Sequence, residues 1–340
     1  QDYDDTHTES VVHPSGAMVP VMFACGERDG MTGAQALRAL ILGTECAIRL
    51  ALPGRNAFHL GGFHTTSVAG TFGAALLSAT SSGSARQVTL DALGICGSFA
   101  SGLLQCVPAA SSAKKLHAGW AGLCGIMAVD LARAGFDGPA SVIEGKLGLY
   151  NSMLPGKRFD LEEIFDGIGD RWHLLDTRPK IYPCCHYLQA FIDCAAALRA
   201  TNDFDTDTIE SIRCEVARGS VNMICDPWAA KLAPVTAYDA RFSLPYAVAV
   251  MLEKGCAGSA ASAVRGPTVF MIDRLALVAD LSAACRPWRE NPALARGPRS
   301  AVQPSRAPPH RPVRCPRQAC RSRREARPPE PRRPVRLRQV

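Results

Sequence analysis

Aromatic residues and long apolar runs are both scarce in this chain of 340 residues. Phe, Trp and Tyr make up 6% of it, which leaves few side chains on which nucleic-acid bases could stack. No run of about 18 uncharged apolar residues occurs, so the sequence predicts no membrane span. The chain holds 14 cysteines but no Cys-x-x-Cys pair, and its eight histidines show no metal-ligand spacing. We therefore expect no disulfide scaffold, no metal site and a reducing, cytoplasmic compartment.

Acidic residues are nearly absent from one part of the chain, the segment 286–340. This segment holds 16 Arg, no Lys and three Glu, as well as 12 of the 24 prolines. The whole chain carries a formal net charge of +7, and without this segment the charge is −6. We expect residues 285–340 to form a disordered tail. Its arginines could bind nucleic-acid phosphates, but a GC-rich gene read out of frame gives the same Arg/Pro bias, and we favour that explanation.

The rest of the chain is rich in Ala, Gly and Leu, with apolar residues at helical spacing. The spacing predicts helices over 30–52, 66–80, 87–104, 118–134, 187–200 and 243–254. Thr32 is a candidate cap for the first of them, and small residues three or four apart predict closely packed helices. Alternating apolar residues predict a strand within 209–216. The predicted fold is mainly α, with a large all-helical domain over 1–175 and a smaller α+β domain over 176–284.

Four short segments place chemistry-bearing side chains near predicted helix starts. Three acids lie within residues 2–5, followed by His7 and His13, a pattern of a cation site or of a solvated helix start. His64 and Lys114 each precede a predicted helix, where free backbone N–H groups favour a carboxylate ligand. A fourth segment, 180–186, ends in two cysteines and a histidine. Helix packing or a solvated surface is the alternative explanation for each segment taken alone.

Seven blocks of sequence, taken in order, carry a family resemblance that no single segment carries. They are D-Y-D-D-T (2–6) with H-P-S-G (13–16), G-F-H-T-T-S-V-A-G-T-F-G-A-A (62–75), A-K-K-L-H-A-G (113–119), L-A-R-A-G-F-D-G-P (131–139), E-G-K-L-G (144–148), K-I-Y-P-C-C (180–185) and D-A-R-F-S-L-P-Y-A-V-A (239–249). In order and spacing they resemble the MmgE/PrpD family, which includes 2-methylcitrate dehydratases and cis-aconitate decarboxylases. The resemblance covers residues 1–256.

The resemblance implies an active site in the cleft between the two domains, no metal or organic cofactor, and a homodimer. Family catalytic positions fall on Asp2, Thr6, His13, His64 and Lys114. Where the family has K-x-Y-P-x-C-x-x-x-H, this chain has Gln189 at the last position. His186 lies three residues earlier, on the same face if the segment is helical, and is a candidate substitute in substrate binding.

The residue types at these positions suit a lyase that acts on di- or tricarboxylates. Such substrates carry two or three negative charges, which Lys, protonated His and helix N-termini can neutralise. We expect Lys114 and His64 to hold a substrate carboxylate and Thr6 to donate a hydrogen bond. Asp2 and His13 would then transfer the protons. Dehydration of a 2-methylcitrate-like hydroxy acid is favoured, as part of propionate catabolism, with decarboxylation of cis-aconitate and epimerisation of an amino-dicarboxylate left open.

The chain departs from the family pattern at both ends. We expect it to lack the helical segment that normally precedes D-Y-D-D-T, and also a recognisable family C-terminus. Because such segments would complete the helical core and the dimer surface, their loss would expose apolar faces. We therefore expect this chain to be marginally stable or inactive.

Overall fold

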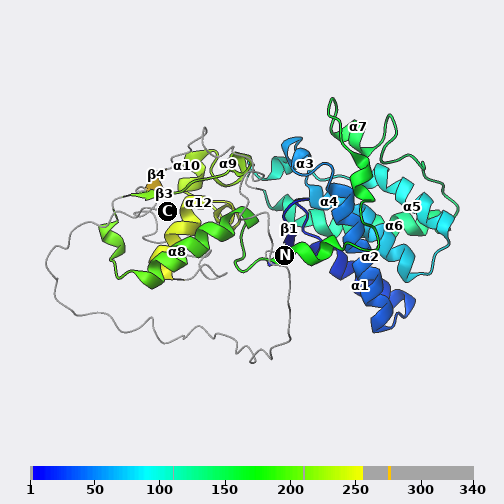
Figure 1. Cartoon of the computed structure of the whole chain (residues 1–340), viewed down its shortest axis with the longest axis horizontal. Coiled ribbons are helices and arrows are strands. Elements are labelled where there is room, and N and C mark those ends of the chain that lie inside the picture. The colour runs from blue at the N-terminus through cyan, green and yellow to red at the C-terminus, as the bar shows by residue number, and fades with distance from the viewer. Residues whose placement is uncertain (1–2, 110, 210, 256–274, 277–340) are drawn as a thin grey trace.

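The computed structural model describes residues 3–109, 111–209, 211–255 and 275–276. The candidate catalytic residue Asp2 and the tail predicted for 285–340 lie outside these residues. Two lobes lie side by side along the long axis of the molecule (Figure 1). One is built from the first two thirds of the described chain and the other from the remainder. The mainly α fold, with a large helical domain and a smaller second domain, is confirmed.

The larger lobe is a bundle of helices arranged around one central helix. Its helices are α1 (Ser15–Asp29), α2 (Gly33–Ala51), α3 (Ala57–Leu60), α4 (Thr65–Ser81), α5 (Arg86–Phe99), α6 (Leu116–Arg133) and α7 (Leu149–Met153). Helix α4 is buried along almost its whole length and packs against α1, α2, α5 and α6. A helix that is apolar all round is typical of such a central position, and α4 is built mainly from Ala, Gly, Leu, Ser and Thr.

Glycines allow the neighbouring helices to approach α4 closely. A Cβ atom added at Gly73 of α4 would lie 2.5 Å from the carbonyl oxygen of Gly43 in α2. A Cβ atom added at Gly125 of α6 would lie 2.5 Å from the Cβ of Ala74. No side chain larger than hydrogen fits at either crossing without a shift of backbone. The close packing predicted from the small residues is therefore confirmed.

The ends of several helices follow from local sequence. Thr32 and Gln35 form a reciprocal capping box at the start of α2, as the Thr32 prediction requires. Helix α1 ends at Gly30, which adopts the left-handed backbone conformation (φ 67°) that glycine tolerates best. Helix α1 was not predicted, and Pro20 lies inside it. The predicted helix over 87–104 was too long, because α5 ends at Phe99 and a separate 3-10 turn covers Leu104–Cys106.

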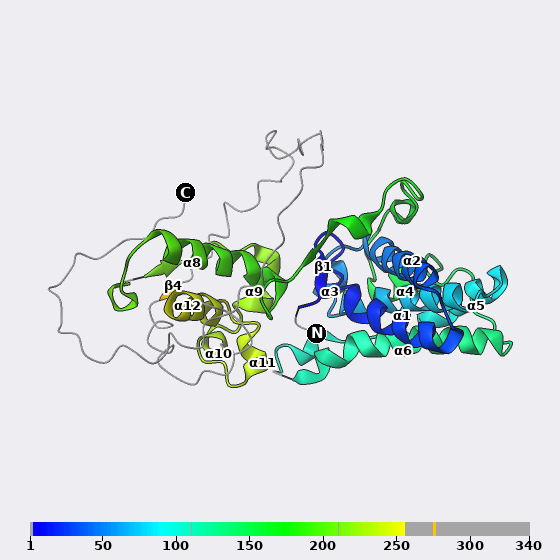
Figure 2. The same cartoon turned by 90° about the horizontal axis from the view of Figure 1, so that it is seen from below.

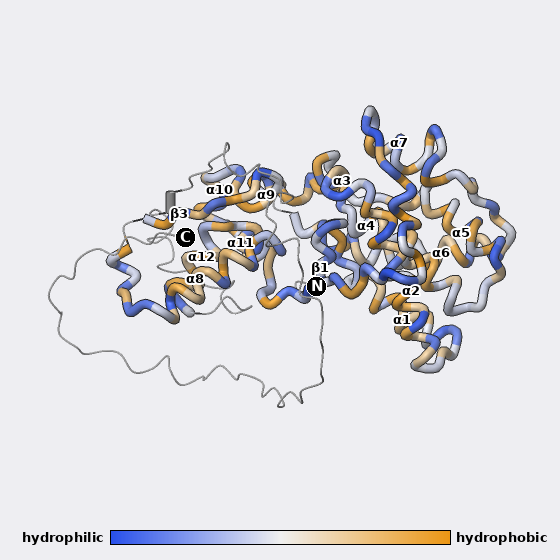
Figure 3. Tube along the Cα trace, in the orientation of Figure 1, coloured by the Kyte–Doolittle hydropathy of each residue, from blue (hydrophilic) through white to orange (hydrophobic). Residues whose placement is uncertain are grey.

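The smaller lobe has its own apolar core between α8 (Gln189–Thr201) and α12 (Leu244–Lys254). Both helices carry apolar stretches along the chain trace, and the two lie together in both views (Figures 1, 2 and 3). Short helices α9 (Arg218–Ile224), α10 (Trp228–Leu232) and α11 (Ala237–Ala240) complete this lobe. The strand predicted within 209–216 is short: β3 (Ile212–Arg213) pairs in parallel with β4 (Leu275–Ala276).

A small antiparallel pair of strands joins the start of the described chain to the segment that links the two lobes. Strand β1 (Asp5–His7) pairs with β2 (Thr177–Pro179), so that Thr6 lies opposite Arg178. Just before β2, the segment that includes the 3-10 helix His173–Asp176 is held to α2 by a buried ion pair. Glu45 accepts hydrogen bonds from the backbone of His173 and Leu174, while Arg49 donates to Glu45 and to several carbonyl groups within 164–171. Within the described ranges, no helix is both long and apolar enough to cross a membrane.

Candidate functional site

A cavity of about 100 Å³ lies between the two lobes, where β1 and the starts of three long helices meet the smaller domain. This volume is several times the roughly 10–15 Å³ that one water molecule needs. The larger lobe contributes Thr6, His13, His64 and Lys114 to its wall, and the smaller lobe contributes His186 and Arg241. Five of the six predicted site residues, Thr6, His13, His64, Lys114 and His186, therefore line one cavity. The sixth, Asp2, is outside the described residues.

Three helix N-termini converge on this cavity. Gly16, Thr66 and Ala118 line it, and each lies within the first three residues of its helix, α1, α4 or α6. The first backbone N–H groups of a helix have no partner inside the helix, and the helix dipole places partial positive charge at that end. The Ser15 N–H of α1 already donates to the Asp5 carboxylate, and the Leu116 N–H of α6 donates to carbonyl groups of the preceding 3-10 helix. The start of α4 is therefore the end best placed to bind an anion, with the dipoles of the other two helices adding positive potential.

Cationic side chains add to this positive potential. Lys114, Lys180 and Arg241 all line the cavity, and Asp4 is the one acidic residue among its described lining residues. Asp4 already pairs with Lys180, with 2.5 Å between Oδ1 and Nζ. Among the described residues, no carboxylate lies within ion-pair distance of Lys114, whose Nζ lies 5.7 Å from the centre of the Phe242 ring. Burial lowers the pKa of Lys114, and the nearby charge of Lys180 lowers it further.

Four imidazole rings form a cluster on the larger lobe's side of the cavity. The ring of His64 lies 5.1 Å from that of His117, 5.9 Å from that of His59 and 6.3 Å from that of His13, centre to centre. Nδ1 of His64 is 3.0 Å from Nδ1 of His117, so one of these two nitrogens donates and the other accepts. Nε2 of His64 is buried and has no hydrogen-bond partner in the described part of the chain. It is therefore available to a ligand.

These histidines are held in the neutral form. Burial, reinforced by the charge of Lys114, keeps the pKa of His64 well below its usual range. Burial and the charge of Lys180 do the same to the pKa of His13. Burial lowers the pKa of His59 to about 4, and Lys114 contributes to that shift. A bound anion would oppose these shifts, because a negative charge stabilises imidazolium.

The hydrogen bonds of His13 fix which of its nitrogens can act as a base. Nδ1 lies 3.0 Å from the carbonyl oxygen of Asp5 and 2.8 Å from Oγ1 of Thr6. A carbonyl oxygen only accepts, so Nδ1 carries the proton and donates it. In the neutral ring, Nε2 is then left with its lone pair and can accept a proton. The backbone N–H of His13 donates to Oγ1 of Thr66, which ties the backbone of His13 to the start of α4.

Gln189 has a structural role, and His186 lines the cavity instead. The Gln189 side chain accepts hydrogen bonds from the backbone of Ile181 and Tyr182 and donates to the carbonyl oxygen of Tyr182. It therefore shapes the loop before α8 and does not line the cavity. His186 does line it, and its Nε2 lies 3.5 Å from Oγ1 of Thr8.

Sequence reasoning assigned no site role to several polar residues of the cavity wall, among them His59, Lys180 and Arg241. Lys180 and Arg241 stand inside two of the seven sequence blocks, and their positive charge in those blocks is the signal that could have identified them. His59 lies in the four-residue helix α3, outside every block, and nothing in its local sequence points to a site.

Comparisons with known proteins agree with this architecture. Residues 1–162 match the model of the MmgE/PrpD N-terminal domain, and residues 182–264 match that of the MmgE/PrpD C-terminal domain.

Three proteins named cis-aconitate decarboxylase are among the similar sequences. The Aspergillus terreus protein is 26% identical over 266 residues, which is 73% of this chain and 54% of that protein. The human protein is 29% identical over 270 residues, 75% of this chain and 53% of that protein. The mouse protein is 30% identical over 271 residues, which is 75% of this chain and 52% of that protein. The chain thus spans about half the length of the curated relatives it matches.

Proposed function

Because this chain belongs to the MmgE/PrpD family, we propose that its interdomain cavity binds a di- or tricarboxylate and that the protein acts on it as a lyase. One observation carries the proposal. Three helix N-termini and the side chains of Lys114, Lys180 and Arg241 surround one small cavity that has a single acidic residue, Asp4, in its described wall. A polyanion is the ligand class that such a wall stabilises best.

Within that class, the proposed reaction is decarboxylation of cis-aconitate. The names of the similar curated proteins support this choice. In this reaction the bond between carbon and the departing carboxylate breaks, CO₂ leaves, and the electron pair stays on the carbon skeleton. The cations of the cavity stabilise that carbanionic charge. A proton must then be delivered to carbon. His64 is suited to this step once the bound polyanion has raised its pKa and protonated the ring, because its Nε2 has no partner among the described residues.

Dehydration of a 2-methylcitrate-like acid is the second candidate, and the state of His13 favours it. Dehydration begins with removal of the proton α to a carboxylate, so it needs a neutral base inside the cavity. His13 is neutral, with its Nδ1 proton directed at Asp5 and its Nε2 free of that proton. The proton passes from carbon to Nε2 of His13, and the electrons of the broken C–H bond form the alkene as hydroxide leaves. Hydroxide takes up the proton that His13 has accepted and departs as water, which returns His13 to its neutral form.

Incubation of the chain with cis-aconitate and, separately, with 2-methylcitrate distinguishes the two reactions. Decarboxylation releases CO₂, while dehydration produces alkene absorbance without CO₂. We expect CO₂ from cis-aconitate. Binding of both acids is measured by calorimetry in parallel. A folded chain that binds neither acid contradicts the proposed function, and alkene without CO₂ selects dehydration.

The proposed assembly is a homodimer. Helix α6 carries four apolar side chains at spacings of three or four residues that are more than a third exposed, namely Leu116, Trp120, Leu123 and Met127. A contiguous exposed apolar stripe is typical of a protein interface. Sedimentation velocity should show a dimer for the natural chain and a monomer for Leu123→Glu, and a monomeric natural chain contradicts this part of the proposal.

A further inference from the structure

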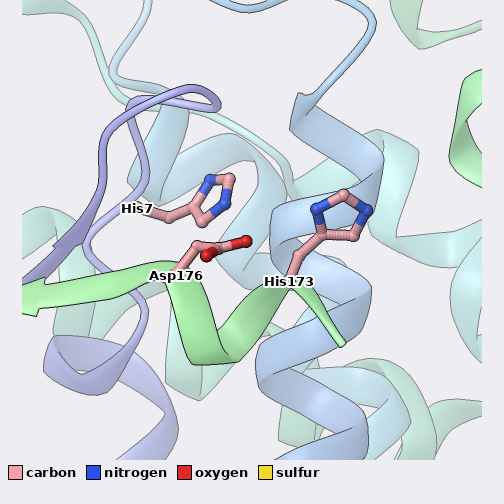
Figure 4. Close-up of side chains that lie close together, drawn as sticks. All are labelled: His7, His173 and Asp176. Atoms are coloured by element: carbon pink, nitrogen blue, oxygen red, sulfur yellow. The ribbon is translucent and has the colours of Figure 1, made fainter. Parts of the chain in front are cut away.

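A second group of polar side chains lies outside the cavity, on the other side of strand β1. His7 of β1 meets His173 and Asp176, which both belong to the 3-10 helix His173–Asp176. Each of the three offers one atom able to bind a metal, and these atoms all lie within 4.8 Å of one another. The Asp176 carboxylate points into the space between the two imidazole rings (Figure 4).

Among the described residues, the hydrogen bonds around the two histidines leave one nitrogen of each ring without a partner. Nδ1 of His7 accepts a hydrogen bond from the backbone N–H of Ser10, at 3.3 Å, and lies 2.9 Å from Oγ of Ser10, which leaves Nε2. Metal binding at Nε2 therefore requires the ring proton to move to Nδ1, which then donates to Oγ of Ser10. Nδ1 of His173 is buried and has no hydrogen-bond partner among the described residues, and His173 itself is only 5% exposed. A buried polar atom without a partner is costly to the folded state. The unpaired nitrogen of His173 is therefore an independent sign that a ligand belongs at this position.

We propose that His7, His173 and Asp176 bind a zinc ion. Two imidazole nitrogens and one carboxylate oxygen are a donor set that suits Zn²⁺, with water as the fourth ligand. Asp176 is exposed, so the ion and the water can enter from solvent. Ligands of a tetrahedral zinc ion lie roughly 3.3 Å apart, so the three atoms, which lie within 4.8 Å of one another, must draw closer when the ion binds. The sequence alone indicated no metal site because these ligands come from two segments far apart in the chain.

Metal binding at this position would act on the cavity through β1. Side chains of a strand alternate between its two faces, and Thr6 and Thr8 line the cavity while His7, between them, takes part in the proposed zinc site. Bound zinc would therefore fasten β1 to the 3-10 helix that precedes β2. It would hold Thr6, and with it the Thr6–His13 hydrogen bond, in a fixed position relative to the segment that links the two lobes.

The test uses the full chain, stripped of metal and titrated with Zn²⁺ by calorimetry and with Co²⁺ by visible absorption. We expect one ion per chain, a tetrahedral Co²⁺ spectrum without a thiolate charge-transfer band, and a higher Tm with Zn²⁺. Asp176→Asn keeps the size of an exposed side chain and should weaken binding at least ~10-fold. Asp170→Asn, an exposed control on the same segment, should leave binding unchanged.

Three outcomes overturn the proposal. The first is no ion bound to the folded natural chain, and the second is equal affinity in the Asp176→Asn variant. The third is a thiolate charge-transfer band, which would place the ion on cysteines instead. None of these outcomes bears on carboxylate binding in the cavity, so the proposed function can stand or fall separately.

Discussion

Replacement of Lys114 by methionine separates binding in the cavity from stability of the fold. Lys114 lies in the 3-10 helix Ser112–Lys115, immediately before α6, and its ammonium group has no carboxylate partner among the described residues. In the ligand-free protein this charge is therefore poorly compensated, as its lowered pKa shows. Methionine keeps the length and the apolar contacts of the stem and removes the charge.

The magnitude follows from the interaction that is lost. A hydrogen bond to a charged group contributes about 1.5–3 kcal/mol, so Lys114→Met should weaken binding of cis-aconitate by about 10- to 150-fold. The ligand-free variant should melt at the same temperature as the natural chain or higher, because a half-buried charge without a carboxylate partner among the described residues has been removed. The affinity for cis-aconitate is thus expected to fall while the melting temperature stays the same or rises.

Calorimetric titration and a thermal melt of each protein provide the assay. Lys157→Met is the matched control, since Lys157 is exposed and does not line the cavity. Unchanged affinity in Lys114→Met would refute the assigned role. A loss of affinity accompanied by a lower Tm would also refute it, because Lys114 would then support the fold.

Three further substitutions test the packing and protonation described above. Arg49→Leu leaves the Glu45 carboxylate buried and unpaired, so urea denaturation should show a loss of about 3–5 kcal/mol; no loss would mean that the pair is dispensable. Gly125→Ala brings a methyl group within 2.5 Å of Ala74 and should cost about 1–3 kcal/mol, with an unchanged Tm as the contrary result. Since the pKa of His59 falls from 6.5 to about 4 on folding, the unfolded chain takes up this proton first and the natural chain loses stability as pH falls through that range. His59→Gln should flatten this dependence by up to about 1.4 kcal/mol per pH unit, and an unchanged slope contradicts the assignment.

Helices with strong local signals were predicted well from sequence. The periodicity over 66–80 and 118–134 gave α4 and α6 to within two residues at each end, and Ser243 caps α12 with Pro245 in its first turn. Helix α1 was missed because Pro20 interrupts its pattern. A proline in a helix interior removes one hydrogen bond, and packing of α1 against α2, α4 and α6 offsets that loss. Such tertiary contacts leave no mark on the local sequence.

The site was predictable only where its residues stand in sequence blocks. Thr6, His13, His64 and Lys114 were found through the family resemblance and meet at one cavity. His59 was not found, because its neighbour in space is His64 and not any residue nearby in sequence. The His7–His173 contact was hidden for the same reason. The predicted domain boundary at residue 175 and the catalytic roles of the site residues stay predictions.

Histidine NMR with and without cis-aconitate tests most directly the central claim that the interdomain cavity binds a polycarboxylate. The Cε1–H signals of His13 and His64, assigned with single His→Gln variants, report the pKa of each ring. Bound polyanion should raise both pKa values, while His173, which is buried outside the cavity, should titrate as before. Unchanged pKa values for His13 and His64 at saturating ligand, or equal shifts in all three histidines, would contradict the account.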